Sequence, residues 1–149
     1  MTEERVERLN FGVKGLMFND EGKFLALHRW DAPQSPKLEL PGGRIDFGET
    51  IEETLIREIR EETNLEATPI ELVTTWNYVK RDQTFQVVGI IYLASVTDLS
   101  TFKLSEEHDS YAWLELSELD RLARHFREPL EKQKEIISEL VKQKRYGVV

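Results

Sequence analysis

A glycine turn followed by a helix crowded with glutamates constrains this chain more than any other feature. Residues 40–43 read Leu-Pro-Gly-Gly, and residues 57–62 read Arg-Glu-Ile-Arg-Glu-Glu. Glycines let the backbone approach a ligand closely, and carboxylates clustered on a rigid element suit a hard divalent cation such as Mg²⁺. The combination indicates a site for diphosphate chemistry.

The limits of the glutamate-bearing helix follow from its own residues. Thr50 and Glu53 have the spacing of a capping box, which predicts a helix start near Ile51. Asn64 is suited to a left-handed stop, so the helix spans about thirteen residues. Four apolar residues recur at helical spacing and predict the face that packs on a core: Ile51, Leu55, Ile56 and Ile59.

The three glutamates of this helix share one face. Glu58, Glu61 and Glu62 fall within an arc of roughly 100° at about 100° per residue. Like charges this close raise one another's pKa unless a cation lies among them. A solvated acidic face is the alternative, and the glutamates alone favour it. The glycine turn, Glu49 and Arg57 at their fixed offsets favour a metal site instead, because a solvated face needs no such partners. Arg57 can pair with an acid on either side of it and so hold the face in shape.

Together these residues resemble the motif of the Nudix hydrolase family, Gly-x5-Glu-x7-Arg-Glu-U-x-Glu-Glu-x-Gly-U, in its MutT-like form. The matching positions are Gly43, Glu49, Arg57, Glu58, Ile59, Glu61, Glu62 and Leu65, so the Nudix box covers residues 43–65. Asn64 stands where the family has glycine, and we expect this to cost stability rather than activity, because asparagine tolerates positive φ. The resemblance implies an α/β (α+β) fold, the three-layer α/β/α sandwich with a mixed sheet.

The resemblance also implies an activity and a metal site. In the family, glutamates matching Glu58 and Glu62 ligate Mg²⁺, often with Glu61 and the carbonyl of the residue matching Gly43; Mn²⁺ is a possible substitute. The implied reaction is Mg²⁺-dependent hydrolysis of the diphosphate linkage of a nucleoside di- or triphosphate derivative, and a housecleaning nucleotide pyrophosphatase is the first choice. A catalytically silent Nudix-like domain that senses a nucleotide or acts as a scaffold is the alternative.

Supporting and proton-transfer roles are less closely fixed by the motif. Glu49 and Arg57 match residues that buttress the loop and helix in the family, the alternative being a surface ion pair. The general base is left open between Glu58, Glu61 and a loop acid, for which we favour Glu107. His108 beside it is either an assistant or a bystander.

Four further residues are candidates for substrate binding. Arg29 and Trp30 lie near a predicted loop, where a guanidinium can bind a phosphate and an aromatic ring can stack on a base. Trp76 and Tyr78 alternate onto one strand face and can form a stacking wall. Packing at a strand end and packing in the core are the respective alternatives. His28 and His125 show no partner pattern and are assigned no role.

Composition limits the partners. The 149 residues predict one domain, residues 1–149, and the absence of cysteine excludes disulfides and thiolate chemistry. A net charge of −8 argues against a long nucleic acid but not against a small nucleotide with its metal. Residues 1–5 lack the pattern of a signal peptide, and the apolar run 87–96 is too short to cross a bilayer. We therefore expect a cytoplasmic enzyme with no membrane partner, and a homodimer is a possible assembly.

Alternation and turn residues predict the remaining elements. Residues 11–18 and 24–28 are expected to form a first hairpin, and a short strand at 38–40 leads into the glycine turn. The other predicted elements are a second hairpin of strands 70–79 and 84–96, a strand at 111–114, a helical segment from Glu118 capped by Ser117, and a final amphipathic helix from about 129 to 144.

Overall fold

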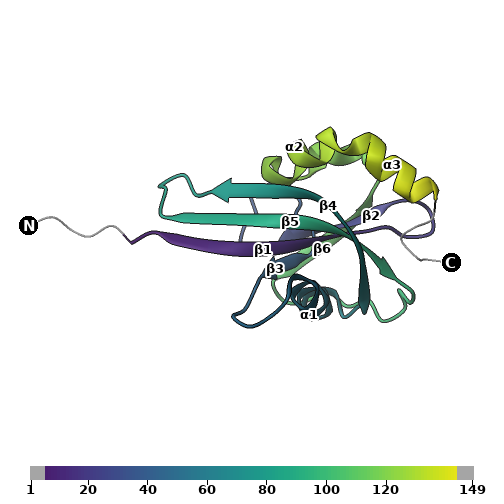
Figure 1. Cartoon of the computed structure of the whole chain (residues 1–149), viewed down its shortest axis with the longest axis horizontal. Helices are drawn as coiled ribbons and strands as arrows, with labels where there is room; N and C mark the ends of the chain where they lie inside the picture. The colour runs from purple at the N-terminus through teal and green to yellow at the C-terminus, as the bar shows by residue number, and fades with distance from the viewer. Residues whose placement is uncertain (1–5, 144–149) are drawn as a thin grey trace, which may run out of the picture.

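The computed structural model describes residues 6–143 and contains the elements drawn in Figure 1. In chain order they are β1 (Arg8–Met17), β2 (Phe24–Arg29), β3 (Gly42–Arg44), α1 (Ile51–Thr63), β4 (Ala67–Val79), β5 (Phe85–Val96), β6 (His108–Leu114), a 3₁₀-helix η1 (Leu116–Arg121), α2 (Arg124–Lys132) and α3 (Lys134–Lys142).

A mixed sheet forms the middle of the molecule. Its strand order is β3-β1-β5-β4, with β1 parallel to β5 and antiparallel to β3, while β4 is antiparallel to β5. Strands β2 and β6 pair separately. Helix α1 lies on one side of the sheet, and α2 and α3 lie on the other (Figure 1). The expected mixed α/β fold with helices on both faces is confirmed.

Each face of the sheet has its own apolar core. The cluster on the α1 side includes Leu55 and Ile59 of the helix, and that on the other side includes Phe126 and Ile137. Successive residues of a strand point to opposite faces, so β1 contributes to both clusters, with Val13 facing α1. The sheet is therefore fixed from both sides, and side chains of β1 can form the floor of a site.

Helix α1 has the limits that the sequence predicts. The amide of Glu53 donates to Thr50 Oγ1 at 3.1 Å, and the Thr50 amide donates to Glu53 Oε1 at 3.0 Å, which is the reciprocal capping box. Asn64 ends the helix with φ 58° in the left-handed region. The second hairpin is confirmed as well, as the antiparallel pair β4 and β5.

The predicted first hairpin is wrong. A turn does form after β1, where Asn19 Oδ1 accepts the amides of Glu21 and Lys23, but the ladder between the two arms is limited to one isolated bridge, between Phe18 and Phe24. The edges of β1 are taken by β3 and β5, so β2 pairs with β6 instead. Local alternation cannot reveal these partners, because they lie far apart in the sequence.

Other elements also differ from those predicted, beyond shifts of about three residues at the starts of β1, β4 and β6. The glycine pair belongs to strand β3, whereas the predicted strand at 38–40 contributes only isolated bridges, at Leu38 and Glu39. The segment expected to start at Glu118 is a 3₁₀-helix that starts at Leu116. The final helix is two helices, with Pro129 inside α2 and a break at Gln133, and its predicted end lies outside the described residues. Within residues 6–143, no helix combines the length and apolar character needed to cross a membrane.

Asn64 gives the first testable prediction. Its side-chain amide donates to the Thr101 carbonyl at 2.9 Å, a contact that glycine cannot make, and its own carbonyl accepts from Thr101 Oγ1 at 3.1 Å. Asn64→Ala should therefore lower the free energy of unfolding by about 1–2 kcal/mol, through left-handed strain and the lost contact. This contact reverses the expectation from the sequence, in which asparagine costs stability relative to glycine: Asn64→Gly loses the contact without the strain and should also lower stability, though by less than Asn64→Ala, as urea denaturation would show. A clearly stabilised Asn64→Gly variant would contradict a structural role for the Thr101 contact.

Candidate functional site

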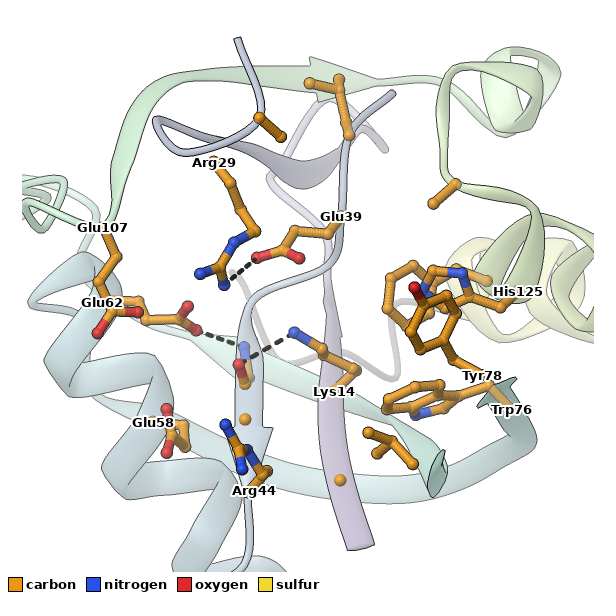
Figure 2. A pocket seen from close by; sticks show the side chains of 18 of the residues that line it. Lys14, Arg29, Glu39, Arg44, Glu58, Glu62, Trp76, Tyr78, Glu107 and His125 are labelled. Carbon is orange, nitrogen blue, oxygen red and sulfur yellow. Dashed lines mark hydrogen bonds and ion pairs between the residues drawn. The ribbon is translucent and has the colours of Figure 1, made fainter. Parts of the chain in front are cut away.

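One pocket, with a volume of about 1000 Å³, gathers most of the candidate residues. Glu58, Glu62 and Glu107 lie at one end of it, and Trp76 and Tyr78 lie at the other (Figure 2). The strands β1, β3 and β4 and the helix α1 contribute to its walls. Carboxylates and aromatic rings thus occupy separate ends of a single cavity.

Glu62 is the most buried acid of the pocket. The side chain is 6% exposed, and Oε1 accepts the amide of Gly42 at 2.6 Å. Burial raises the pKa of Glu62 to about 7, against the opposing influence of the Lys14 ammonium and of the Gly42 amide. A carboxylate in this position gains stability from any cation that approaches it.

Glu58, which lies one helical turn before Glu62 on α1, also contacts the glycine turn. A Cβ added to Gly43 would lie 2.5 Å from Glu58 Oε2, so any larger residue there would displace this carboxylate from its place against the backbone. Burial raises the pKa of Glu58, although the Arg57 guanidinium acts against it. The glycine and the glutamate that the motif places fifteen positions apart are therefore in direct contact.

Arg57 connects the helix to the loop before it. Its guanidinium donates to both oxygens of Glu49, at 2.6 and 2.8 Å, to Glu58 Oε1 at 2.8 Å and to the Arg44 carbonyl at 3.1 Å. Contact with Glu61 is longer, at 3.4 Å. The hydrogen bond from Arg57 holds the pKa of Glu49 at about 2. These two residues form a connected network rather than an isolated surface pair.

Two other proton-acceptor candidates face the same end of the pocket. Glu61 lines it with a largely exposed side chain, and Glu107 lines it from the segment before β6. The carbonyl of Glu107 accepts the amide of Trp30 at 3.2 Å, which ties that segment to the end of β2. Figure 2 shows Glu107 at the same end of the pocket as Glu62 and Glu58, so the loop acid and the helix glutamates line one end of the cavity.

A buried cluster behind these acids was not predicted. His108 Nε2 lies 2.9 Å from Glu39 Oε1 and 3.6 Å from Glu62 Oε2, and candidate ligand atoms of the three lie within 4.8 Å of one another. Burial raises the pKa of Glu39, but Lys14, His108 and Arg29 bring it to about 2. In the sequence, only the position of Glu39 near the Pro-Gly-Gly turn could have indicated that this residue belongs to the site.

Arg29 and Trp30 do line the pocket, but Arg29 is already engaged. The guanidinium donates to both oxygens of Asp31, at 2.9 and 3.0 Å, and lies 3.9 Å from Glu39. Trp30 is 59% exposed at the rim. The structure thus leaves Trp30 available to a ligand, whereas Arg29 would have to give up or share its contacts.

At the aromatic end of the pocket, Trp76 is more buried than a stacking wall would require. Trp76 is buried, its indole donates to the Ile90 carbonyl at 3.2 Å, and its ring lies edge-on to Phe126 with centroids 4.9 Å apart. Tyr78 is exposed and contacts His125, with centroids 4.9 Å apart. Burial lowers the pKa of His125 to about 4, so this ring is neutral near pH 7. His125, to which the sequence gave no role, therefore belongs to the pocket wall.

His28 also has partners that the sequence did not show. Its Nδ1 lies 2.7 Å from Asp109 Oδ1, and its Nε2 lies 2.7 Å from the Ser35 carbonyl. Because both partners accept, a ring that carries two protons satisfies both contacts, and the hydrogen bond to Asp109 raises the pKa of His28. This contact secures the loop after β2, part of which lines the pocket.

Comparison with known proteins identifies the family. The NUDIX domain model matches residues 8–134, so the chain belongs to this family and the resemblance seen in the sequence is confirmed.

Relatives and solved structures agree with this assignment. The chain is 37% identical to the asymmetrical bis(5'-nucleosyl)-tetraphosphatase of Mus musculus over 103 residues, which cover 66% of this chain and 63% of that one. It is 31% identical to the ADP-ribose pyrophosphatase of Methanocaldococcus jannaschii over 111 residues, covering 74% and 64%. The crystal structure of the MutT protein from Methanosarcina mazei Go1 is similar, with a TM-score of 0.76 and 27% identity over 87% of this chain and 95% of that one. The matched region thus spans a little under two thirds of these two curated relatives.

The residues at the acidic end suit a divalent metal. Oxygen donors are what Mg²⁺ and Mn²⁺ prefer, and Glu58, Glu61 and Glu62 supply carboxylates beside a turn where glycine leaves the backbone accessible. Burial already disfavours the charged forms of Glu58 and Glu62, which a cation would offset. The family's metal therefore fits the side chains found here.

The Arg57 network yields a second prediction. Arg57→Met leaves Glu49 and Glu58 without their charged donor and should lower the free energy of unfolding by about 1–2 kcal/mol, given the partial exposure of the group. Arg60→Met on the same helix is the matched control, because Arg60 pairs with Glu66 in an exposed setting. Equal losses in thermal or urea denaturation would show that the network adds nothing beyond a surface pair.

Proposed function

We propose that this protein is a Nudix hydrolase that cleaves the diphosphate linkage of a nucleoside di- or triphosphate derivative with Mg²⁺, for which Mn²⁺ is a possible substitute. The observation that supports the proposal best is the pocket itself, where metal-compatible carboxylates occupy one end and aromatic rings occupy the other. A nucleotide has the matching polarity, with phosphates that need a cation and a base that stacks on aromatic rings. The names of the relatives agree with this substrate class.

In this proposal the metal is held by Glu58, Glu61, Glu62 and the Gly43 carbonyl. When bound, Mg²⁺ would polarise the phosphoryl oxygens and lower the pKa of a water molecule. Arg57 and Glu49 keep the helix and the preceding loop in register, so that the carboxylates stay aimed into the pocket. The reaction forms a bond between the water oxygen and one phosphorus, and breaks the bond from that phosphorus to the bridging oxygen.

The proton of the water passes to a carboxylate, and Glu107 is our first choice. Its side chain faces the acidic end from outside the helix, whereas Glu58 and Glu61 already contact Arg57. Tyr78 and Trp30 are the exposed aromatic groups on which a base could stack, while Trp76 supports that wall from the core. A cytoplasmic housecleaning role remains our first choice, and light scattering would test for a homodimer.

The metal assignment predicts the behaviour of isosteric variants. Glu58→Gln or Glu62→Gln should reduce Mg²⁺-dependent turnover of a mixed nucleotide panel at least about a hundredfold, because the charge is lost while the shape is kept. Glu52→Gln, an equal charge change on the exposed part of the same helix, is the control and should remain active. Full activity in either pocket variant would refute the assignment. A wild-type protein that binds a nucleotide tightly but turns over no member of the panel would favour the sensor instead.

A separate variant tests the general base. Glu107→Gln should lower kcat by about 10²–10⁴-fold with little change in KM, since proton transfer is lost and binding is not. Its neighbour Glu106, which does not line the pocket, is the control as Glu106→Gln. An unchanged kcat in Glu107→Gln would return the role to Glu61 or Glu58.

A further inference from the structure

Lys14 occupies the middle of the pocket floor. It projects from β1 toward the face opposite α1 and is only 8% exposed. The ammonium donates to the Gly42 carbonyl at 3.1 Å and lies 5.6 Å from the centre of the Phe126 ring. Figure 2 shows this nitrogen between the acidic end and the aromatic end. The residue is the one cation in an otherwise apolar or small stretch of β1, residues 11–17.

The ammonium group has hydrogen-bonding capacity to spare. It carries three N–H donors, and among the described residues its hydrogen bond goes to a neutral carbonyl. Burying a charge without full pairing is costly, so an acceptor supplied by a ligand would be favourable here. The nearby acids feel the charge, because Lys14 lowers the pKa of both Glu39 and Glu62.

The other lysines and arginines that line the pocket already contact protein groups. Arg29 is held by both oxygens of Asp31, and the Arg44 guanidinium lies over the Phe85 ring at 5.5 Å. Lys37 donates to the Asp120 carbonyl at 2.8 Å. Lys80 is exposed at the rim and lies 3.6 Å from Asp82. Lys14 therefore combines burial, a central position and unused donors.

We propose that Lys14 binds a non-bridging oxygen of the phosphate attached to the nucleoside, at the point where the ligand passes from the acidic end to the aromatic end. This inference rests on the proposed function, because it takes the ligand to be a nucleotide. The carboxylates cannot bind that phosphate directly, since like charges repel. An ammonium between the two ends supplies the missing opposite charge and fixes how far the base can advance into the aromatic end.

A purely structural role is the competing explanation, in which Lys14 only balances the buried charge of Glu39 and Glu62. The two roles differ in what they predict for ligands. A counter-charge affects the stability of the fold and the acids around it, whatever the ligand carries. A phosphate-binding lysine discriminates between a nucleoside and the same nucleoside with a phosphate.

The experiment compares wild type with Lys14→Met by calorimetric titration, in the presence of Mg²⁺, with AMP and GMP and with adenosine and guanosine. Wild type should bind a 5'-monophosphate more tightly than its nucleoside. Lys14→Met should bind the monophosphate about ten- to a hundredfold more weakly, the value of a hydrogen bond to a charged group, with nucleoside binding unchanged. Lys23→Met removes an equal charge from a residue that does not line the pocket and should leave the monophosphate preference intact.

Two further measurements keep the result unambiguous. Mn²⁺ titration without nucleotide should show that Lys14→Met binds the metal at least as tightly as wild type, because a repelling charge is gone and the acidic end is intact. Lys14→Arg keeps the charge and should recover part of the monophosphate preference. Lys14→Gln replaces Lys14→Met if the latter does not fold.

Several outcomes would overturn the proposal. One is equal affinity of the wild type for nucleoside and monophosphate. Another is an unchanged monophosphate affinity in Lys14→Met. A third is an equal loss of affinity for both ligands in Lys14→Met, which would place Lys14 against the base or sugar or in a structural role. The readout does not depend on turnover. Failure of hydrolysis with the expected binding pattern would count against the proposed function alone, and hydrolysis without that pattern would count against Lys14 alone.

Discussion

The hydrogen bond from the Gly42 amide to the buried carboxylate of Glu62, 2.6 Å long, is the contact on which the site depends. It joins the last turn of α1 to β3, and so to the central sheet. Because Glu62 has little access to water, this amide is one of the few groups that stabilise its charge. The absence of a Cβ at Gly43 brings Glu58 against the same strand. Helix and strand are thereby held together at the acidic end of the pocket.

Strand β1 connects the two halves of the pocket. Its residues face both cores, and it lies between β3, which carries the glycines, and β5, which positions β4 and the aromatic wall. Gly12 takes part in the same arrangement, because a Cβ there would lie 2.7 Å from the Trp76 ring. This strand therefore sets the distance between the acidic end and the aromatic end, which in the proposed function receive the phosphates and the base.

Features encoded in short stretches of sequence could be predicted, whereas those that depend on distant partners could not. The capping box, the left-handed stop at Asn64 and the acidic face of α1 all depend on residues within one or two helical turns. The parallel pairing of β1 with β5 and the contact of Glu39 with His108 join segments with no local pattern in common. Lys14 had a signal, a lone cation in an apolar strand, but its meaning depends on Gly42 and Phe126, which only the fold brings near.

The parallel alignment of β1 with β5 also orders events during synthesis. In this register Lys14 lies opposite Ile91, so one edge of β1 has no partner until most of the chain has left the ribosome. Helix α1, whose stabilising contacts are local, can form much earlier. Such long-range pairing slows folding, because the conformational entropy of a large loop is lost before the strands form their hydrogen bonds. A nascent chain that ends before Phe85 would thus carry the glutamates of α1 without the strand that pairs with β1 along its length and without Glu107, so the pocket would be complete only after the later elements have formed.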